Sequence, residues 1–386
     1  MNKLTSKLYT KLNHQLKSEW LELEEESSCS VFQSYSWFEK WLEFNHNRIN
    51  SLNIEIYVVY EDEKVPVALF ALELRKHMTN VVYKFAGDRL SEYNMPIITN
   101  RYNNLKRKAV WEKLLESISS HDCFLIERYP KANINRKEEL NLIELRGIKI
   151  GQSKSVCTKT YKDIDELMKN VSKKMIKDNR RFTRRLNEIG NIEYVHYRNR
   201  DEYIKIFNEI SICLEEKVRK MRIPFSSKIF INDNYYNSFY NLGNGSNIAS
   251  DLIGIKLDGQ LLAACWSLRY KDKLYYLYPA YMNTSYIKYS PGRLLLEYLI
   301  RFSFKNNIKQ IDFTLGNESY KYNWSGEKNI LNDYIRISTI KGYLILIQKK
   351  FVNLIKSNST LLRIIREILF SLEGIQINSK KPRVYR

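Results

Sequence analysis

The residues best suited to chemistry begin at Lys288 and lead into a helical pattern. Ser290, Pro291 and Gly292 follow a strand-like segment, and apolar residues with helical spacing come directly after them. Ser is favoured at an N-cap, Pro at the first helical position, and Gly lets the backbone approach a ligand without a Cβ. The free N–H groups of a helix start attract anions, and Lys288 and Arg293 add positive charge. The segment is typical of a phosphate site, although a capped helix without a ligand would show the same residues.

A second segment with binding chemistry is strongly basic. Residues 173–185 contain seven basic residues and one acidic residue. Helical spacing places Lys177, Arg180 or Arg181, and Arg184 along one face. Because Arg suits bidentate recognition of phosphate, this face would fit a nucleotide-sugar, a lipid pyrophosphate or a tRNA backbone. A solvated basic face is the alternative that charge alone leaves open.

Composition excludes several classes of protein. The chain has 386 residues, 44% of them hydrophobic, so it can fill two ordinary domains and is not globally disordered. Its five Cys are scattered without a CxxC pair and its five His are isolated, so neither a disulfide framework nor a metal site is expected. The first residues lack the apolar run of a signal peptide, and no segment of about 18 apolar residues could span a membrane. We therefore expect a cytoplasmic protein without a metal.

The C-terminal tail is also basic. Residues 341–386 hold ten basic residues and two acidic ones, in a chain whose formal net charge is +20. Apolar residues recur at helical spacing over 342–377, which predicts one or two amphipathic basic helices. Such a helix could lie on an anionic membrane surface, which would place the protein at the inner membrane face. Packing of the same apolar stripe against the preceding domain is equally compatible with the pattern.

Two successive α/β units are predicted to position these segments. The first is an antiparallel meander of three strands, then a helix and a strand, expected at residues 54–60, 65–74, 81–86, 103–118 and 123–126. The second has two helical stretches, three strands, a helix and two strands, expected at residues 163–189, 201–220, 252–256, 261–270, 274–281, from 291, 308–315 and 334–340. We divide the chain into an N-terminal domain (1–155), a C-terminal domain (156–341) and a basic helical tail (342–386). The fold class is α/β (α+β), with a mixed, mostly antiparallel sheet flanked by helices in each domain.

Four blocks of sequence make the chain resemble a known family. They are FQSYSW at 32–37 followed by Trp41, FAG at 85–87 followed by Glu92 and Tyr93, SKKMIKDNRRFTRRLNEIG at 172–190, and SPGRLLLEYLIRFSFKNNIKQIDFTLGNESYKYNW at 290–324. With the order of strands, they make the chain similar to the GNAT acetyltransferases, and within these to the CelD/BcsL-like branch, a relative of the Fem aminoacyl transferases. That branch carries two GNAT-like folds in tandem. The last block is the most specific, but of the usual phosphate-loop glycines only Gly292 is present.

The resemblance implies a donor and a place for it. An acyl-CoA, in the first instance acetyl-CoA, would act as co-substrate, with its pantetheine arm between splayed central strands. The residues implied at the donor are Lys288, Ser290, Gly292 and Arg293.

The resemblance also implies roles in catalysis. Acyl transfer needs a base for the nucleophile, a polarised carbonyl and an acid for the leaving thiolate. Asp312 could orient an acceptor or take its proton, with a structural hydrogen bond to the neighbouring turn as the alternative. Tyr320 could protonate the thiolate or simply pack, and Lys321 could bind a phosphate or an acceptor carboxylate. Cys265 is expected to be an apolar filler rather than a nucleophile. The residues expected at a phosphorylated acceptor are Lys177, Arg180, Arg181 and Arg184.

The predicted function is acyl transfer, in the first instance of acetyl, from acyl-CoA to an amino or hydroxyl group of a sugar in cell-surface polysaccharide biosynthesis. The acceptor would be a small molecule or a lipid-linked sugar. One alternative keeps the fold but takes aminoacyl-tRNA as the donor, as in the Fem enzymes. Another is a non-enzymatic nucleic-acid-binding module, which would need aromatic and basic residues interleaved on an exposed sheet. Because the basic cluster is on a helix, nucleic acid other than tRNA is not an expected partner.

Overall fold

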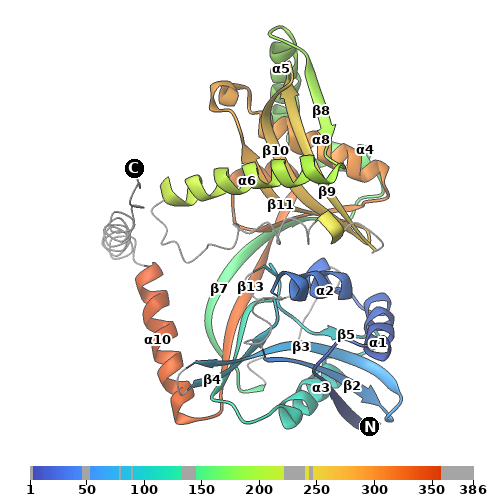
Figure 1. Ribbon diagram of the computed structural model, residues 1–386, viewed down its shortest axis with the longest axis vertical. Helices are drawn as coiled ribbons and strands as arrows, with labels where there is room; N and C mark the ends of the chain where they lie inside the picture. The colour runs from blue at the N-terminus through green and yellow to red at the C-terminus, as the bar shows by residue number, and fades with distance from the viewer. Residues whose placement is uncertain are drawn as a thin grey trace, which may run out of the picture.

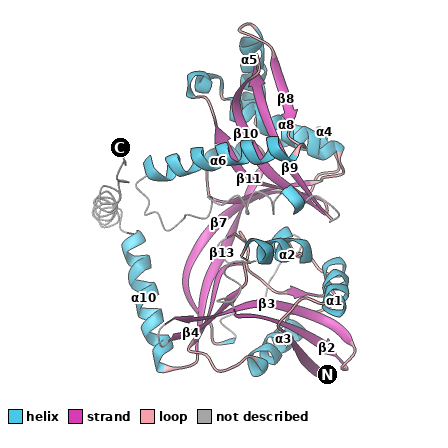
Figure 2. Cartoon of the chain, viewed as in Figure 1, coloured by secondary structure: helices cyan, strands magenta, loops and turns pink. Residues whose placement is uncertain are grey.

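Strands from both halves of the chain join into one 13-stranded sheet, with helices packed against its faces (Figure 1, Figure 2). The computed structural model describes residues 3–45, 53–77, 80–87, 90–131, 145–220, 240–242 and 247–357. The part of the predicted helical tail beyond Ser357 lies outside these residues.

The first half of the chain runs from β1 to β7. Its elements are β1 (Leu4–Tyr9), α1 (His14–Glu25), the 3-10 helix η1 (Val31–Gln33), α2 (Tyr35–Phe44), β2 (Asn53–Glu61), β3 (Val65–His77), β4 (Asn80–Phe85), β5 (Ile97–Ile98), α3 (Asn104–Ser117), β6 (Cys123–Pro130) and β7 (Ile148–Thr158). The predicted meander, helix and strand are confirmed as β2, β3, β4, α3 and β6.

The second half contains the basic helix and the segment from Lys288 onward. Its elements are α4 (Ile164–Asn170), α5 (Lys173–Asn187), β8 (Ile192–His196), α6 (Arg200–Lys220), β9 (Ile248–Leu257), β10 (Gln260–Tyr270), β11 (Lys273–Tyr281), the 3-10 helix η4 (Thr284–Tyr289), α8 (Pro291–Lys305), β12 (Gln310–Leu315), α9 (Ser319–Asn323), β13 (Gly326–Ile337) and α10 (Ile340–Ser357). The predicted helices and strands are present, but the helical stretch expected at 163–189 is two helices, α4 and α5, and the strand expected at 334–340 is β13, which begins at residue 326 and ends at 337. β8 and α9 are additional.

The order of strands repeats itself about the centre of the sheet. It is β1-β2-β3-β4-β6-β13-β7-β12-β11-β10-β9-β8, so the same succession of elements leads inward from each edge. β4 pairs with β6 in parallel, as β11 does with β12. The other neighbours in this order are antiparallel. The predicted mixed, mostly antiparallel sheet is therefore confirmed, and its two halves are built alike.

The two halves exchange their last strands. β7 follows β6 along the chain but pairs with β12 and β13, whereas β13 follows β12 but pairs with β6 and β7. In Figure 1 both strands run from one half of the molecule into the other. The boundary that we placed at residues 155 and 156 falls inside β7. The limits of the two domains therefore remain predictions. Each half of the sheet contains a strand that comes from the other half of the chain.

Two apolar cores lie on opposite faces of the C-terminal strands. One contains Trp20 of α1, Phe207 of α6 and Trp266 of β10, so both halves of the chain share it. The other contains Leu295 of α8 and Met175 of α5. α6 and α8 consequently cover opposite faces, and α5 lies on the same face as α8.

A third core fills the N-terminal half between β4, β6 and α3. β4 and β6 pair over only two residues each. The ring of Trp111 on α3 lies 6.2 Å from Phe85 of β4, 6.1 Å from Phe124 of β6 and 6.2 Å from Tyr129 of β6, between ring centroids. Aromatic side chains thus occupy the space beside this parallel pair.

Candidate active site

Strands β11 and β12 separate in the middle of the sheet. They pair in parallel only where Lys273–Tyr275 lies beside Gln310–Asp312. On β11 the register with β10 then shifts, because Leu277 is left without a partner on β10. Such a bulge bends and twists its strand. In the part of the chain that the structure describes, no other strand takes up this edge of β11, so its backbone faces the gap.

An aspartate bends β12 at the same point. The Oδ1 atom of Asp312 accepts the N–H of Thr314 at 2.8 Å. Thr314 has a φ of 54°, in the left-handed region that a β-branched residue seldom adopts. The register with β7 shifts between Asp312 and Leu315. Because its carboxylate holds this turn, Asp312 helps to direct β12 away from β11.

The gap between the separated strands opens into a cavity of about 790 Å³. β11, the end of β12, the start of α8, the last described part of α6 and the region of α9 line it. Five predicted site residues line this cavity: Ser290, Gly292, Arg293, Tyr320 and Lys321. The other six predicted residues are not among its lining: Lys177, Arg180, Arg181, Arg184, Lys288 and Asp312.

The helix start has the predicted position and N-cap residue but not a side-chain cap. α8 begins at Pro291, as expected. Ser290 has φ 48° and ψ 54°, and its side chain makes no capping hydrogen bond. Ser290 is the N-cap residue, as predicted, and its carbonyl oxygen accepts the N–H of Arg293 at 2.9 Å, but its left-handed backbone does not present the side chain as a cap. Lys288 is exposed on η4, with its ammonium group 5.1 Å from the centroid of the Tyr289 ring.

The ring of Tyr281 lies against Gly292. A Cβ placed on Gly292 would be 2.9 Å from Cζ of Tyr281 and 3.0 Å from its hydroxyl oxygen. Tyr281 is 46% exposed, so its ring can swing aside. A ligand that approaches the backbone at Gly292 therefore meets a movable side chain and not a fixed wall.

Arg293 brings a guanidinium group with spare hydrogen-bonding capacity to the cavity. Its Nε donates to Oδ1 of Asn179 on α5 at 2.7 Å, and Nδ2 of Asn179 donates to Glu297 at 2.7 Å. Its Nη2 is buried and has no hydrogen-bond partner among the described residues. A buried donor without an acceptor is unfavourable, so this atom is suited to an anionic ligand.

Tyr320 and Lys321 enter the cavity region from α9. Burial raises the pKa of Tyr320, which keeps its hydroxyl protonated. Its ring also packs on Phe313, with centroids 6.4 Å apart. Lys321 is 2% exposed, and its Nζ donates to the carbonyl oxygen of Leu315 at 2.6 Å and pairs with Glu318 at 2.9 Å. Tyr320 can thus serve as an acid, whereas the ammonium group of Lys321 already ties α9 to the end of β12.

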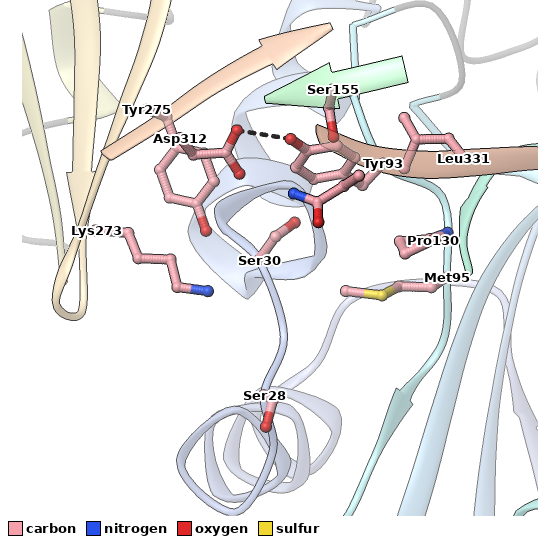
Figure 3. Close-up of a pocket in the computed structure, with 11 residues that line it drawn as sticks. Ser28, Ser30, Tyr93, Met95, Pro130, Ser155, Lys273, Tyr275, Asp312 and Leu331 are labelled. Atoms are coloured by element: carbon pink, nitrogen blue, oxygen red, sulfur yellow. Dashed lines mark hydrogen bonds between the residues drawn. The ribbon is translucent and has the colours of Figure 1, made fainter. Parts of the chain in front are cut away.

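Asp312 lies outside this cavity. Phe313, Thr314 and Leu315 line the cavity, whereas Asp312, one residue earlier on β12, does not. Asp312 lines a small cavity of about 30 Å³ with Lys273 and Tyr93, and its Oδ1 accepts the hydroxyl of Tyr93 at 2.6 Å (Figure 3). Burial raises the pKa of Asp312. Asp312 thus makes the structural hydrogen bond to the neighbouring turn, which was the alternative to a contact with the acceptor.

The basic residues of α5 are exposed, and this helix lies beside α8. α5 contacts both η4 and α8. Arg181 pairs with Asp178 at 2.9 Å, and Arg184 lies 3.6 Å from Glu188. The helix is therefore near the start of α8, while its outward cations remain in solvent.

The sequence assigned no role to Tyr281 or Glu92, both of which belong to this region. Burial raises the pKa of Glu92, and its Oε2 accepts the N–H of Leu315 at 3.4 Å. Glu92 and its neighbour Tyr93 come from the N-terminal half, yet both contact the bent segment of β12. Their presence in one of the four blocks was the only signal, because no local pattern predicts a contact over more than 200 residues.

Other chemistries receive little support from the described residues. Among them, no group of three or more His, Cys, Asp or Glu could hold a metal ion. Cys265 is fully buried, and burial raises the pKa of its thiol well above the ordinary value, as suits an inert filler. None of the described helices combines the length and apolar character needed to cross a membrane.

Comparison with known proteins finds a domain family within the second half of the chain. Residues 173–322 match the model of the acetyltransferase (GNAT) domain. No curated protein matches the sequence significantly. The crystal structure of FemX is similar to the chain with a TM-score of 0.63 and 12% identity, over 88% of this chain and 99% of that one. At this identity the likeness to FemX shows the fold.

Two further solved structures are more distant. A tandem GNAT protein from the clavulanic acid biosynthesis pathway has a TM-score of 0.47 and 10% identity, over 87% of this chain and 98% of that one. L-PGS from Bacillus licheniformis has a TM-score of 0.49 and 11% identity, over 88% of this chain and 96% of that one. The matched GNAT domain, which spans less than half of the chain, supports an acyltransferase enzyme.

Proposed function

We propose that the protein transfers an acyl group, in the first instance acetyl, from acyl-CoA to an amino or hydroxyl group of a sugar in cell-surface polysaccharide biosynthesis. The sugar pathway is taken from the resemblance to the CelD/BcsL-like branch. The observation that carries the proposal is the cavity between β11 and β12, which ends at the start of α8. A long arm with phosphates at one end fits this shape and this placement of positive charge.

The donor would use both walls of the gap. Backbone groups on the unpaired edge of β11 can bond to the amides of a pantetheine arm. Gly292, once the ring of Tyr281 moves, lets a phosphate reach the N–H groups at the start of α8, and Arg293 adds its free Nη2. Ser290 would contribute backbone rather than a side-chain cap. Lys288 lies outside the cavity and would reach the donor only as a surface charge.

The chain's own residues can then move the protons of acyl transfer. The attacking amine or hydroxyl forms a bond to the acyl carbon, and the thiolate of CoA leaves. Tyr320, which its burial keeps protonated, is the group proposed to protonate that thiolate. Glu216 on α6 and Glu318 before α9 are carboxylates that line the cavity and can accept the proton of the acceptor. Asp312 is proposed to position β12.

A binding comparison tests the donor. Acetyl-CoA, free CoA and tRNA are offered separately to the full-length protein in calorimetry or native mass spectrometry. We expect acetyl-CoA and CoA to bind and tRNA not to bind. Binding of tRNA alone would replace this proposal with the aminoacyl-tRNA-dependent alternative, and binding of none of the three would overturn both.

The alternative of an aminoacyl-tRNA donor has two observations in its favour. The fold is that of FemX, and α5 presents exposed Lys and Arg side chains that could contact a nucleic acid backbone. A non-enzymatic nucleic-acid-binding module is no longer an alternative, because the chain contains an acyltransferase domain. Lys321 as an acceptor ligand is also less favoured, since its ammonium group is already held by Leu315 and Glu318.

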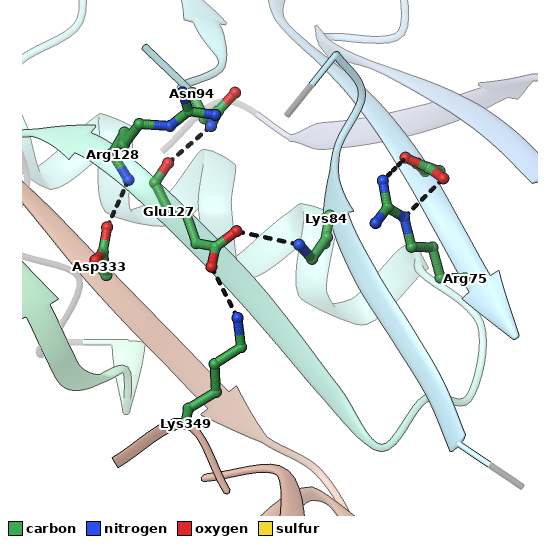
Figure 4. Close-up of polar contacts among 8 residues, drawn as sticks. Arg75, Lys84, Asn94, Glu127, Arg128, Asp333 and Lys349 are labelled. Carbon is green, nitrogen blue, oxygen red and sulfur yellow. Dashed lines mark hydrogen bonds and ion pairs between the residues drawn. The ribbon is translucent and has the colours of Figure 1, made fainter. Parts of the chain in front are cut away.

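Helix α10 supports a lipid-linked acceptor at a membrane face. Its inner side is fixed to the sheet, where Lys349 pairs with Glu127 at 2.9 Å (Figure 4). Asn353 of the same helix donates to the carbonyl oxygen of Ile150 at 2.7 Å. Its outer side carries large apolar side chains, each at least 57% exposed: Ile340, Tyr343, Leu344, Ile347, Phe351 and Leu354. We call these six residues the outer apolar stripe. They do not pack against the preceding domain, so over this part of the tail that alternative is wrong.

A further inference from the structure

The basic helix α5 carries two stripes of charged residues. At 3.6 residues per turn, its buried side is centred on Met175, Asn179 and Leu186. The stripe on one side of it, called here the donor-side stripe, contains the cations Lys174, Arg181 and Arg185. The stripe on the other side, called the far stripe, contains Lys173, Lys177, Arg180 and Arg184.

The donor-side stripe lies next to the ring on α5 that stacks on Arg293 of α8. Asn179 accepts the Nε hydrogen of Arg293, which fixes the buried side of α5 against the start of α8. The ring of Phe182 lies 5.3 Å from Cζ of Arg293 and 5.1 Å from Cζ of Arg181, measured to its centroid. Around the circumference of α5, Phe182 lies between the buried side and the donor-side stripe. Arg181 is therefore the cation of this stripe nearest to Arg293, and Arg185 and Lys174 lie further along the same stripe.

The charges at this ring are not balanced. Arg181 has a carboxylate partner in Asp178 at 2.9 Å. Arg293 has no ion pair with a carboxylate among the described residues, and its buried Nη2 has no acceptor. Two guanidinium groups beside one ring repel each other unless an anion lies near both. Phosphate would supply both the negative charge and the missing acceptor oxygen.

We propose that Arg293 and the donor-side stripe of α5 bind the phosphates of the CoA donor. This inference rests on the proposed function and deepens it by assigning α5 to the donor instead of the acceptor. α5 and α8 cover the same face of the sheet, so a nucleotide that leaves the cavity at Arg293 passes directly along the donor-side stripe. CoA carries a pyrophosphate and a 3′-phosphate at that end of the molecule. The far stripe points away from this path.

The two stripes provide a matched comparison. Arg181→Gln/Arg185→Gln removes two charges from the donor-side stripe, and Arg180→Gln/Arg184→Gln removes two from the far stripe. All four side chains are exposed, so both variants should fold, which far-UV circular dichroism checks. Calorimetry then measures the affinity of each full-length protein for CoA, 3′-dephospho-CoA and pantetheine at low salt. The equal loss of charge controls for general attraction of anions.

We expect the donor-side variant to bind CoA at least tenfold more weakly, 3′-dephospho-CoA with a smaller loss, and pantetheine unchanged. The far-stripe variant should bind CoA within about twofold of the parent, as only general screening is altered. Equal losses in both variants, or no loss in the donor-side variant, would overturn the inference and leave the proposed function in place. Failure of the parent to bind CoA would overturn the proposed donor and this inference with it. A steeper fall of CoA affinity with salt in the parent than in the donor-side variant is the second expected sign.

Discussion

At the scale of single residues, Gly292 and Tyr281 share the space in front of the start of α8. We expect Gly292→Val to leave the protein folded, because the three atoms nearest to an added Cβ all belong to the free end of the Tyr281 side chain. Its affinity for acetyl-CoA should fall more than tenfold, a loss of about 1.4 kcal/mol or more, because a fixed side chain fills the backbone approach. Calorimetry measures this loss. Tyr281→Ala, which empties the same space, should bind at least as tightly as the parent; parental affinity in folded Gly292→Val would refute the site.

Substitutions of Asp312 distinguish a structural role from a role as general base. Asn at this position keeps an oxygen for the N–H of Thr314 and the hydroxyl of Tyr93, but it cannot take a proton. We therefore expect Asp312→Asn to retain kcat/KM within about tenfold, whereas removal of a general base costs about 10²–10⁴-fold. Asp312→Ala, which also loses the hydrogen bonds, should bind acetyl-CoA more weakly. Loss of activity in the Asn variant with unchanged donor binding would restore the catalytic role.

The same substitution has a consequence for stability. Burial raises the pKa of Asp312 from its ordinary value of 3.8, so the folded protein holds this proton more tightly than the unfolded chain. The contribution of this carboxyl to stability is therefore greatest at acid pH and falls as the pH rises through the raised pKa. We expect Asp312→Asn, which is never charged, to gain Tm relative to the parent as the pH increases from 4 to 8. A difference in Tm that is constant over this range would contradict the assignment.

Tyr320 sets the alkaline limit of the proposed reaction. A general acid can donate its proton only below its pKa, and burial raises the pKa of Tyr320. Protonation of the thiolate by Tyr320 should therefore persist through mildly alkaline pH. We expect Tyr320→Phe to lower kcat by about 10²–10⁴-fold while the Kd of acetyl-CoA is unchanged. Between pH 7 and 9, kcat of the parent should fall no more than kcat of Tyr320→Phe, because Tyr320 stays protonated over this range. Equal kcat in the two proteins would return Tyr320 to a packing role.

At the scale of elements, α10 has two faces of different character. Its inner side depends on Glu127, whose burial alone would raise the pKa but whose neighbours Lys84 and Lys349 lower it to about 2. These pairs therefore hold the helix at neutral pH and weaken only as the pH falls toward that value. The side chains of the outer apolar stripe are instead at least 57% exposed. One face of α10 is anchored by charge, and the other is left for a non-aqueous partner.

Flotation with liposomes tests that partner. We expect the full-length protein to float with vesicles that contain anionic lipid, because exposed apolar and basic groups on one helix favour an anionic interface. Ile347→Glu, within the outer apolar stripe and 63% exposed, should reduce flotation. Gln348→Glu, its exposed neighbour outside the stripe, adds the same charge and should not. A protein that never floats, or equal loss in both variants, would remove the membrane from the proposal.

Sequence patterns predicted the elements whose apolar residues follow a regular helical or strand spacing. They failed for elements that lack such a spacing. β2 is rich in β-branched residues, β3 is rich in apolar residues, and a polar turn separates the two strands, so their positions were clear. β7 was not predicted as a strand, because its first half is polar and exposed and becomes a strand only by pairing with β13. The side to which Asp312 points was also beyond prediction, since a shift of one residue in a strand reverses its face. Residue types thus located the gap, while long-range pairing decided which side chains line it.

At the scale of the whole molecule, the exchange of β7 and β13 makes the two halves interdependent. We expect a fragment of residues 156–386 to be unfolded when expressed alone, because it lacks most of β7 and the shared core. Near-UV circular dichroism and a thermal scan measure this. The full-length protein should unfold in a single transition, and mixing with residues 1–155 should restore the near-UV signal. A fragment that melts cooperatively by itself would contradict this coupling.

Strand exchange also limits how such a protein can change through its history. A recombination event that deletes or replaces either half removes a strand from the middle of the sheet of the other half. The two copies are therefore inherited together, even where only one keeps an opening for a ligand. In the N-terminal copy, Trp111 and its aromatic neighbours fill the space beside β4 and β6, whereas in the C-terminal copy the corresponding parallel pair borders the cavity. One copy is free to lose its pocket, but it is not free to lose its strands.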